Sequence, residues 1–178
     1  MMVRKFDTEP TADIAQYRPA AGAVIFNSHG QVWLGRRANE TRDEIWQYPQ
    51  GGIDAGENQE IAVLREVHEE TSITAKHLAP LGMIKEQLFY DLPGQYKITE
   101  RTKKWRGQRQ YWYAFRFIGK DKHIDLSLQD PAEFSAWKWG DLNEAVDTVV
   151  DFKRDVYARL ANEFKAFANP VTGSKLYK

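Results

Sequence analysis

The sequence contains no cysteine, and this absence excludes several kinds of site. None of the 178 residues is Cys, so disulfides, thiolate metal sites and a thiol nucleophile do not arise. A chain without cysteine is compatible with a reducing compartment, where disulfides are rare. We therefore expect a cytoplasmic protein.

Long apolar runs and an excess of one charge are also missing. No stretch approaches the ~20 apolar residues that a bilayer-spanning helix needs, and residues 1–16 lack the apolar segment of a secretory signal. The 25 basic and 25 acidic residues give a formal net charge of zero, which argues against coating a membrane or nucleic acid by bulk electrostatics. We expect no membrane and no DNA partner, and any polyanion must be bound by a local patch. Oligomeric state is not indicated.

What is present fits a single α/β domain. A content of 42% hydrophobic and 28% charged residues is ordinary for a globular protein, and the length suits one core. We expect a flexible lead-in at 1–16, the domain at 17–167 and a C-terminal tail at 168–178. Residue patterns predict strands at 19–26, 31–36, 78–90, 108–119 and 134–139, and helices at 58–71, 141–147 and 152–167.

The predicted helix at 58–71 has two unlike sides. At 100° per residue, apolar positions fall together on one side: Ile61, Leu64, Val67 and Thr71. Glu66, Glu69 and Glu70 fall within an arc of about 100° on the other. The helix should therefore dock on a core and present its carboxylates outward or into a cleft. His68 falls near the apolar side, which favours a packing role over a catalytic one.

The glutamate cluster needs a cause. Like charges one turn apart cost a few tenths of a kcal/mol per pair, and a plain solvated acidic face is the simplest interpretation. However, a Gly-rich loop precedes the helix, Glu57 stands at its start, and Arg65 lies between loop and carboxylates. Carboxylate oxygens at this spacing can share Mg²⁺, which also retains waters for a phosphate substrate. The pattern indicates a divalent-metal site, with Mn²⁺ as an alternative ion.

This spacing resembles the Nudix box, G-x5-E-x7-R-E-U-x-E-E-x-G-U, where U is a bulky apolar residue. The match runs over 51–73, from Gly51 through Glu57 to Arg65-Glu66-Val67-His68-Glu69-Glu70-Thr71-Ser72-Ile73, and departs only at Ser72, where the box has glycine. A glycine there suits a left-handed residue at a helix end. Serine should therefore affect helix-end geometry and local stability more than chemistry.

The resemblance implies a Nudix-type α/β/α sandwich with a mixed β-sheet, and a hydrolase of nucleoside diphosphates linked to another group. It implies that the metal is held by Glu66, Glu69 and Glu70, with the Gly51 carbonyl as a further ligand. It also implies a structural ion pair between Glu57 and Arg65. We favour Glu70 as the base that deprotonates the attacking water, and a metal-bound hydroxide is an equally valid description.

Segments outside the box resemble one branch of this family, the bacterial RNA pyrophosphohydrolases and dinucleoside polyphosphate hydrolases. The most specific are WQYPQGG at 46–52 and FKRDVY at 152–157. This resemblance implies that Glu133 is a further metal-binding acid and that Phe152 and Lys153 form a base pocket, although the residue pattern alone would make Phe152 part of the core. Gln50, inside WQYPQGG, joins the expected substrate-binding residues.

A 5′-triphosphate needs cations that bind its oxygens. Arg18 and Arg37 are our candidates, because the planar guanidinium binds phosphate through paired hydrogen bonds. A basic stretch at 101–109, which runs into the start of the strand at 108–119, could follow an RNA backbone, or be an ordinary solvated loop. Its cations are Arg101, Lys103, Lys104, Arg106 and Arg109.

We therefore expect a metal-dependent enzyme that removes pyrophosphate from the 5′-triphosphate end of RNA. The close alternative is asymmetric hydrolysis of dinucleoside polyphosphates, such as diadenosine tetraphosphate, to ATP and AMP. Removal of nucleoside triphosphates ranks third, together with a non-catalytic Nudix-fold binding module. Retention of all four box glutamates and Arg65 argues against the binding module.

Overall fold

The computed structural model describes residues 13–171, apart from the side chain of Arg101. Residues 1–12 of the expected lead-in and 172–178 of the expected tail lie outside the described residues. Residues Ile14–Gln16 form a 3-10 turn directly before the first strand. None of the helices within 13–171 is long and apolar enough to cross a membrane.

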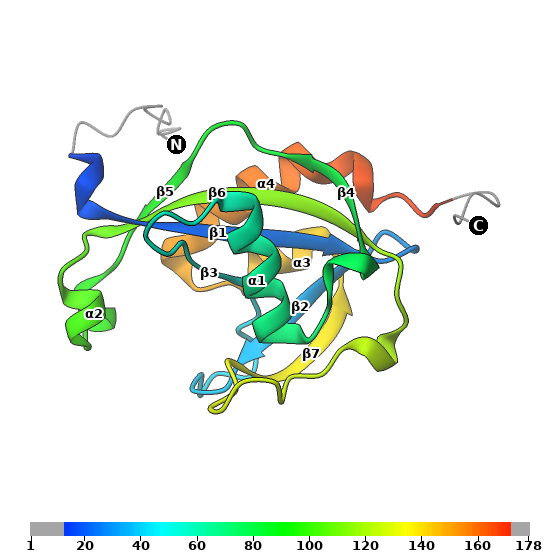
Figure 1. Ribbon diagram of the computed structural model, residues 1–178, viewed down its shortest axis with the longest axis horizontal. Coiled ribbons are helices and arrows are strands. Elements are labelled where there is room, and N and C mark those ends of the chain that lie inside the picture. Colours follow the sequence, from blue (N-terminus) through cyan, green and yellow to red (C-terminus); the bar gives the residue numbers. More distant parts are fainter. Residues whose placement is uncertain (1–12, 172–178) are drawn as a thin grey trace.

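A mixed sheet forms the centre of the described chain (Figure 1). Its strands are β1 (Tyr17–Phe26), β2 (Val32–Arg37), β3 (Gln50–Gly52), β4 (Leu78–Met83), β5 (Leu88–Asp91), β6 (Gly107–Phe117) and β7 (Phe134–Gly140). The order is β4-β6-β1-β2-β7, with β3 paired to β1 and β5 paired to β6. The pair β1–β6 is parallel, and the other strand pairs are antiparallel.

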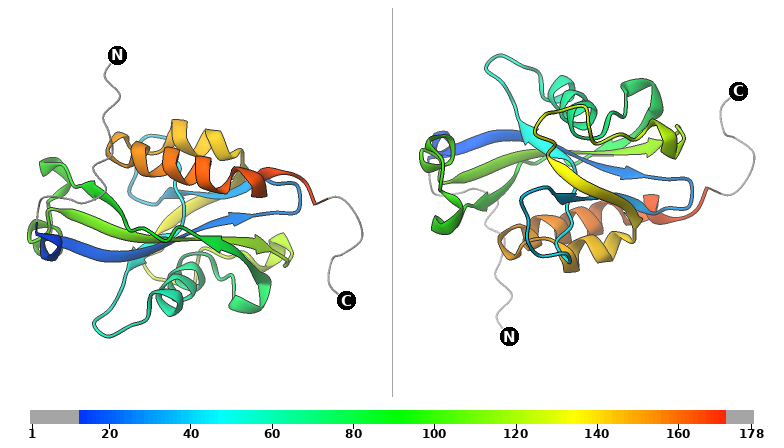
Figure 2. Two further views of the ribbon diagram at one scale, coloured as in Figure 1. Left: turned by 90° about the horizontal axis from the view of Figure 1, so that it is seen from above. Right: turned by 90° about the horizontal axis from the view of Figure 1, so that it is seen from below.

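Helices cover both faces of the sheet (Figure 2). The helix α1 (Gln59–Thr71) packs on one face, where Ala62, Val63 and Val67 join a buried cluster with Ala21 and Ala23 of β1. On the other face α3 (Leu142–Thr148) and α4 (Arg154–Phe164) cover a second buried cluster. A short helix, α2 (Glu100–Lys103), lies in the β5–β6 connection. The α/β/α sandwich with a mixed sheet is confirmed.

Two predicted elements are divided in the structure. The strand expected at 78–90 is two strands, because Met83 pairs with Tyr113 and Leu88 with Gln110, so five steps along one chain face three along β6. The surplus residues cannot stay in the ladder. The helix expected at 152–167 begins and ends in 3-10 turns, at Asp151–Lys153 and Lys165–Ala168.

The predicted orientation of α1 was wrong in part. Ile61 is 62% exposed and His68 is exposed, so neither packs in the core. Glu70 is instead 7% exposed. The difference follows from the packing of Ala62 and Val63 against the alanines of β1. With these residues facing the sheet, the buried side of the helix includes Glu70 and excludes Ile61. His68 is therefore a surface residue.

Candidate active site

The loop before α1 is fixed to the helix by Arg65. Its Nε donates to Glu57 Oε1 at 2.7 Å and its Nη2 donates to Glu57 Oε2 at 2.8 Å. The same Nη2 reaches the Gly52 carbonyl at 2.9 Å. The Arg65 hydrogen bonds lower the pKa of Glu57 to about 2. The expected ion pair is therefore present, and Asn58 caps the helix immediately after it by accepting from the Glu60 amide at 2.7 Å.

Glu66 lies against Gly51 of β3. The space that a Cβ would take at Gly51 is filled by the Glu66 carboxylate, so only glycine permits this approach. Arg65 Nη1 donates to Glu66 Oε1 at 2.8 Å. Burial nevertheless raises the pKa of Glu66, and the nearby charge of Glu69 adds to the rise.

Glu70 is the buried member of the cluster. Its Oε2 accepts a hydrogen bond from the Gln50 amide at 3.0 Å, which ties α1 to β3. Burial raises the pKa of Glu70 well above the usual value for glutamate, and the charges of Glu133 and Glu66 raise it further. Glu133 reaches this group from the segment before β7 and pairs with Arg37 at 2.8 Å.

Glu69 has a partner that the sequence did not indicate. Its Oε2 accepts from Arg65 Nη1 at 3.3 Å and from Gln129 Nε2 at 3.1 Å. Gln129 lies in the β6–β7 connection, outside any periodic or motif-like stretch. No sequence signal could have identified it.

Three of the acidic side chains are paired with basic partners. Arg65 holds Glu66 and Glu69, whereas Arg37 holds Glu133. Among the described residues, no three acidic or histidine side chains converge on one point as a metal-ligand group. The assignment of Glu66, Glu69, Glu70, Glu133 and the Gly51 carbonyl as ligands therefore stays a prediction.

A cavity of about 440 Å³ lies beside this cluster, on the α4 face of the sheet. Four of the predicted substrate-binding residues line it: Arg37, Gln50, Phe152 and Lys153. The β5–β6 connection supplies another wall, which includes Gln95, Tyr96 and Ile98. The structure thus brings together residues from β2, β3 and the turn before α4.

Lys153 is buried at the base of the cavity. Its Nζ lies 3.4 Å from Gln47 Oε1 and 5.6 Å from the centre of the Tyr90 ring. Burial, with the charge of Arg37, lowers the pKa of Lys153 to about 8. This ammonium group is only partly compensated, which suits an anionic ligand. We therefore favour phosphate binding over the base pocket that the resemblance implies for Lys153.

Phe152 is half-buried and is not the simple core residue that its pattern suggests. Its ring lies between two tyrosines, with centroids 5.3 Å from Tyr90 and 4.9 Å from Tyr96. The three rings form an aromatic wall of the cavity.

The two most specific sequence segments contact each other. Tyr48, in WQYPQGG, stacks on Tyr157, in FKRDVY, with ring centroids 4.7 Å apart. The Tyr157 hydroxyl also accepts from the Tyr48 amide at 2.9 Å. These contacts fix the loop leading to β3 against α4, and so set the distance between the carboxylates and the cavity.

The remaining predicted substrate residues are dispersed. The Arg18 guanidinium occupies the space that a Cβ on Gly52 would take. It is close enough to Glu66 for its charge to lower the pKa of that carboxyl. Arg109 alternates on β6 with Gln108 and Gln110, so it lies on the α1 face, away from the cavity. Its Nε is buried without a hydrogen-bond partner among the described residues.

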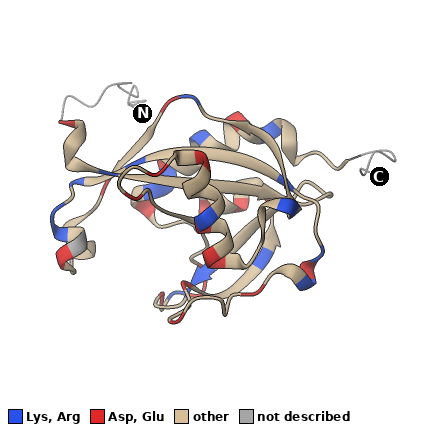
Figure 3. Cartoon of the chain, viewed as in Figure 1, with Lys and Arg blue, Asp and Glu red and all other residues tan. Residues whose placement is uncertain are grey.

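Several cations of the basic stretch are paired. Lys103 pairs with Glu100 at 2.8 Å, and Arg106 pairs with Asp91 at 2.9 Å. Lys104 lies over the Trp105 ring at 5.2 Å. Basic and acidic positions are interspersed over the view in Figure 3. A path for RNA along this stretch stays a prediction.

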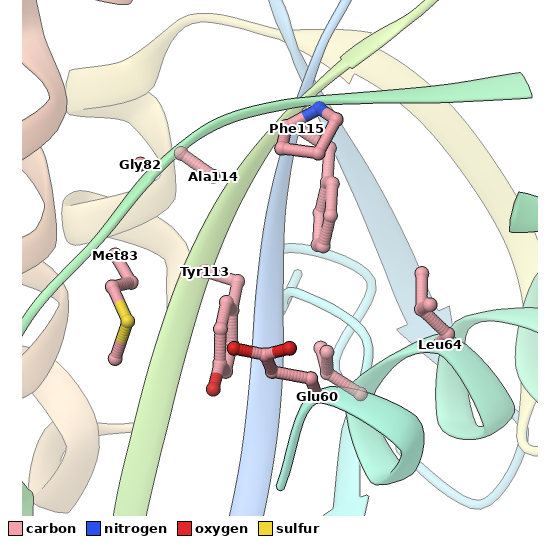
Figure 4. A pocket seen from close by; sticks show the side chains of 9 residues that line it. Glu60, Leu64, Gly82, Met83, Tyr113, Ala114 and Phe115 are labelled. Carbon is pink, nitrogen blue, oxygen red and sulfur yellow. The ribbon is translucent and has the colours of Figure 1, made fainter.

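A second hollow, of about 320 Å³, lies between α1 and β4 (Figure 4). Its walls are largely apolar, with Leu64, Met83 and Phe115 among the lining residues. Its charged side chain is Glu60, and none of the described lysines or arginines lines it. This hollow does not suit a phosphate, whereas the cavity beside Arg37 and Lys153 does.

Comparisons with known proteins agree with the geometry. The NUDIX domain model matches residues 16–160. A curated protein of Caulobacter vibrioides, named RNA pyrophosphohydrolase, is 43% identical over 88% of this chain and 90% of its own. One of the same name from Azorhizobium caulinodans is 44% identical over 86% and 95%.

Solved structures share the fold at low identity. The Ap4A hydrolase of C. elegans has a TM-score of 0.59 and 21% identity, over 84% of this chain and 98% of that one. The dihydroneopterin triphosphate pyrophosphohydrolase of E. coli has a TM-score of 0.64 and 18% identity, over 83% and 98%. The extent of the domain match and the identity to curated relatives establish that the chain belongs to the NUDIX family.

Proposed function

We propose that this chain is a cytoplasmic, divalent-metal-dependent pyrophosphohydrolase acting on the 5′-triphosphate end of RNA. The proposal rests mainly on the positions of Arg37 and Lys153. Both line the cavity, and Arg37 also pairs with Glu133 of the acidic cluster. A substrate that spans the two regions needs a base at one end and a phosphate chain at the other. Curated relatives named RNA pyrophosphohydrolase support this choice.

The acidic residues fit a hard divalent cation. Their donors are all oxygens, which Mg²⁺ prefers, and burial together with neighbouring carboxylates raises the pKa of both Glu66 and Glu70. Glu66, Glu69, Glu70, Glu133 and the Gly51 carbonyl would hold Mg²⁺, with Mn²⁺ as the alternative. Bound there, such an ion would polarise a phosphoryl oxygen and would lower the pKa of a bound water.

The protein groups then have distinct tasks. Arg37, Arg18 and Lys153 bind phosphate oxygens, and Phe152 contacts a base of the RNA end. Glu70 accepts the proton of the attacking water. The water oxygen bonds to the phosphorus nearest the RNA, the anhydride bond to the next phosphate breaks, and pyrophosphate leaves.

Asymmetric hydrolysis of a dinucleoside polyphosphate is the second candidate. Its substrate also carries a base and a phosphate chain, so the aromatic wall of Tyr90, Phe152 and Tyr96 would serve it equally. Nucleoside triphosphate removal ranks below, because it requires neither the FKRDVY segment nor the basic stretch. A purely binding role also ranks below, because it has no use for an electrostatically costly glutamate cluster.

Activity on a triphosphate-ended oligonucleotide tests the proposal. With Mg²⁺ we expect RNA carrying a 5′-monophosphate and an equivalent of pyrophosphate, and excess EDTA should abolish turnover. Equal turnover with and without EDTA would contradict metal dependence. Absence of any product with fully folded protein would contradict the activity.

A further inference from the structure

Ser72 does more than end α1. Its φ of 62° lies in the left-handed region, and its amide donates to the His68 carbonyl at 2.8 Å. Its hydroxyl donates to the Asp125 carbonyl at 2.7 Å. In return the Asp125 amide donates to the Thr71 carbonyl at 3.0 Å. Two hydrogen bonds therefore dock the segment before β7 on the end of the helix (Figure 1).

The docked segment is tied again further along. Asp125 Oδ1 accepts from the amide and the hydroxyl of Ser127, at 2.8 and 2.7 Å, which stiffens the turn. At its far end the Glu133 carbonyl accepts from the Ala38 amide at 2.8 Å. Residues 125–133 thus bridge α1 and β2.

This segment places the side chain of Gln129 beside Glu69. Gln129 Nε2 and Arg65 Nη1 both donate to the same oxygen, Oε2. Neither of these two hydrogen bonds uses the other oxygen of Glu69. Two donors on one oxygen fix the rotation of a carboxylate and direct the second oxygen elsewhere, as hydrogen-bonded carboxylates do around metal sites.

We propose that Gln129 is a positioning residue: it orients Glu69 toward the divalent cation, and the contact of Ser72 with Asp125 places it there. This inference rests on the proposed function, since it assumes that the cluster binds a cation. It concerns a residue outside the Nudix box, on a segment that contacts the end of the box at Thr71 and at Ser72, the position where the sequence departs from the box.

Mn²⁺ binding to the substrate-free protein tests this role, measured as the loss of the EPR signal of free Mn²⁺. Gln129→Ala should raise the dissociation constant for Mn²⁺ about tenfold, the scale typical of partners of metal ligands. Gln129→Met, which keeps the length of the side chain and removes the donor, should do the same. Leu128→Ala is the matched control, because Leu128 is a neighbour on the same segment and is 51% exposed.

The possible results distinguish failure of the positioning role of Gln129 from failure of the proposed metal-dependent function. The thermal midpoint without metal should be nearly unchanged in Gln129→Met, whereas a structural role would lower it. Mn²⁺ affinity equal to wild type in both Gln129 variants, or an equal loss in Leu128→Ala, would overturn the positioning role. Absence of Mn²⁺ binding by the wild-type protein would overturn the proposed function itself.

Discussion

Arg65 and Glu57 are joined by two parallel hydrogen bonds of 2.7 and 2.8 Å, and the same guanidinium holds the Gly52 carbonyl. One side chain therefore fixes the loop that begins in β3 to the helix that carries the carboxylates. Because both partners are largely shielded from solvent, the pair should contribute measurably to stability.

Glu57→Gln should lower the free energy of unfolding at pH 7 by about 2 kcal/mol, the scale of a hydrogen bond to a charged group. Urea unfolding measures the change. Glu60→Gln is the matched control, because Glu60 is exposed in the first turn of the same helix. A similar loss in the control would assign the effect to the helix end in general.

The same variant has a pH signature. The pKa of Glu57 is lowered from 4.5 to about 2, chiefly by its hydrogen bonds to Arg65. A lowered folded pKa gives stability that is complete above the unfolded pKa and is lost as pH falls through the folded one. The difference between wild type and Glu57→Gln should therefore shrink between pH 4.5 and 2. A difference that stays constant over this range would contradict the assignment.

Glu70→Gln should cut turnover by at least ~10²-fold, as loss of a general base or metal ligand does. The amide oxygen of Gln can still accept from the Gln50 amide, so the fold should be retained. Removing a buried charge should also raise stability in the absence of metal. His68→Gln, on the exposed side of the same turn, should be nearly fully active. Near-normal turnover in Glu70→Gln would remove this residue from the mechanism.

Lys153 should give the free enzyme a basic limb in its pH profile. Its pKa is lowered to about 8 by burial and by Arg37, so the ammonium form that binds phosphate is lost as pH rises through about 8. We expect kcat/KM for triphosphate RNA to fall above that pH. Lys153→Met should lower kcat/KM at pH 7 about tenfold and lack the limb, whereas Lys165→Met, on the surface, should keep both. If kcat/KM of Lys153→Met still falls above about pH 8, the titration belongs to another group.

Ser72 variants separate backbone strain from the side-chain contact. Sequence alone predicts that Ser72→Gly is slightly more stable, because a side chain in the left-handed region costs ~1 kcal/mol. The bond to Asp125 offsets that gain by about 1 kcal/mol, so the net change should be close to zero. Ser72→Ala loses the bond and keeps the strain, and should unfold about 1 kcal/mol more easily. Equal stability of the two variants would contradict this division.

The sequence predicts those parts of the site that depend on residues close together in the chain. The helix at 59–71, its cap at Asn58 and the pairing of Glu57 with Arg65 depend on residues within one loop and one helix. Helical periodicity does not give the orientation of that helix on the sheet. Ile61 is exposed and Glu70 is buried because the alanines of β1 accept Ala62 and Val63.

Contacts between distant segments escape sequence reasoning for a different reason. Gln129 meets Glu69, 60 residues away, because the segment that carries it is bound to the end of α1 through Asp125 and to the end of β2 through Glu133. Arg109 follows the alternation of β6, but which face of that strand meets the cavity depends on how β1, β3 and β6 pair. The residue pattern predicts that Phe152 is part of the core. It lies in the cavity wall instead, where Tyr90 and Tyr96 flank it.

The central claim is that triphosphate-ended RNA is the substrate, and one comparison tests it most directly. Turnover of such an RNA and of diadenosine tetraphosphate is measured in parallel, at matched enzyme and Mg²⁺ concentrations. We predict that release of pyrophosphate from the RNA has the larger kcat/KM. Turnover of the dinucleotide that exceeds that of the RNA by orders of magnitude would contradict it.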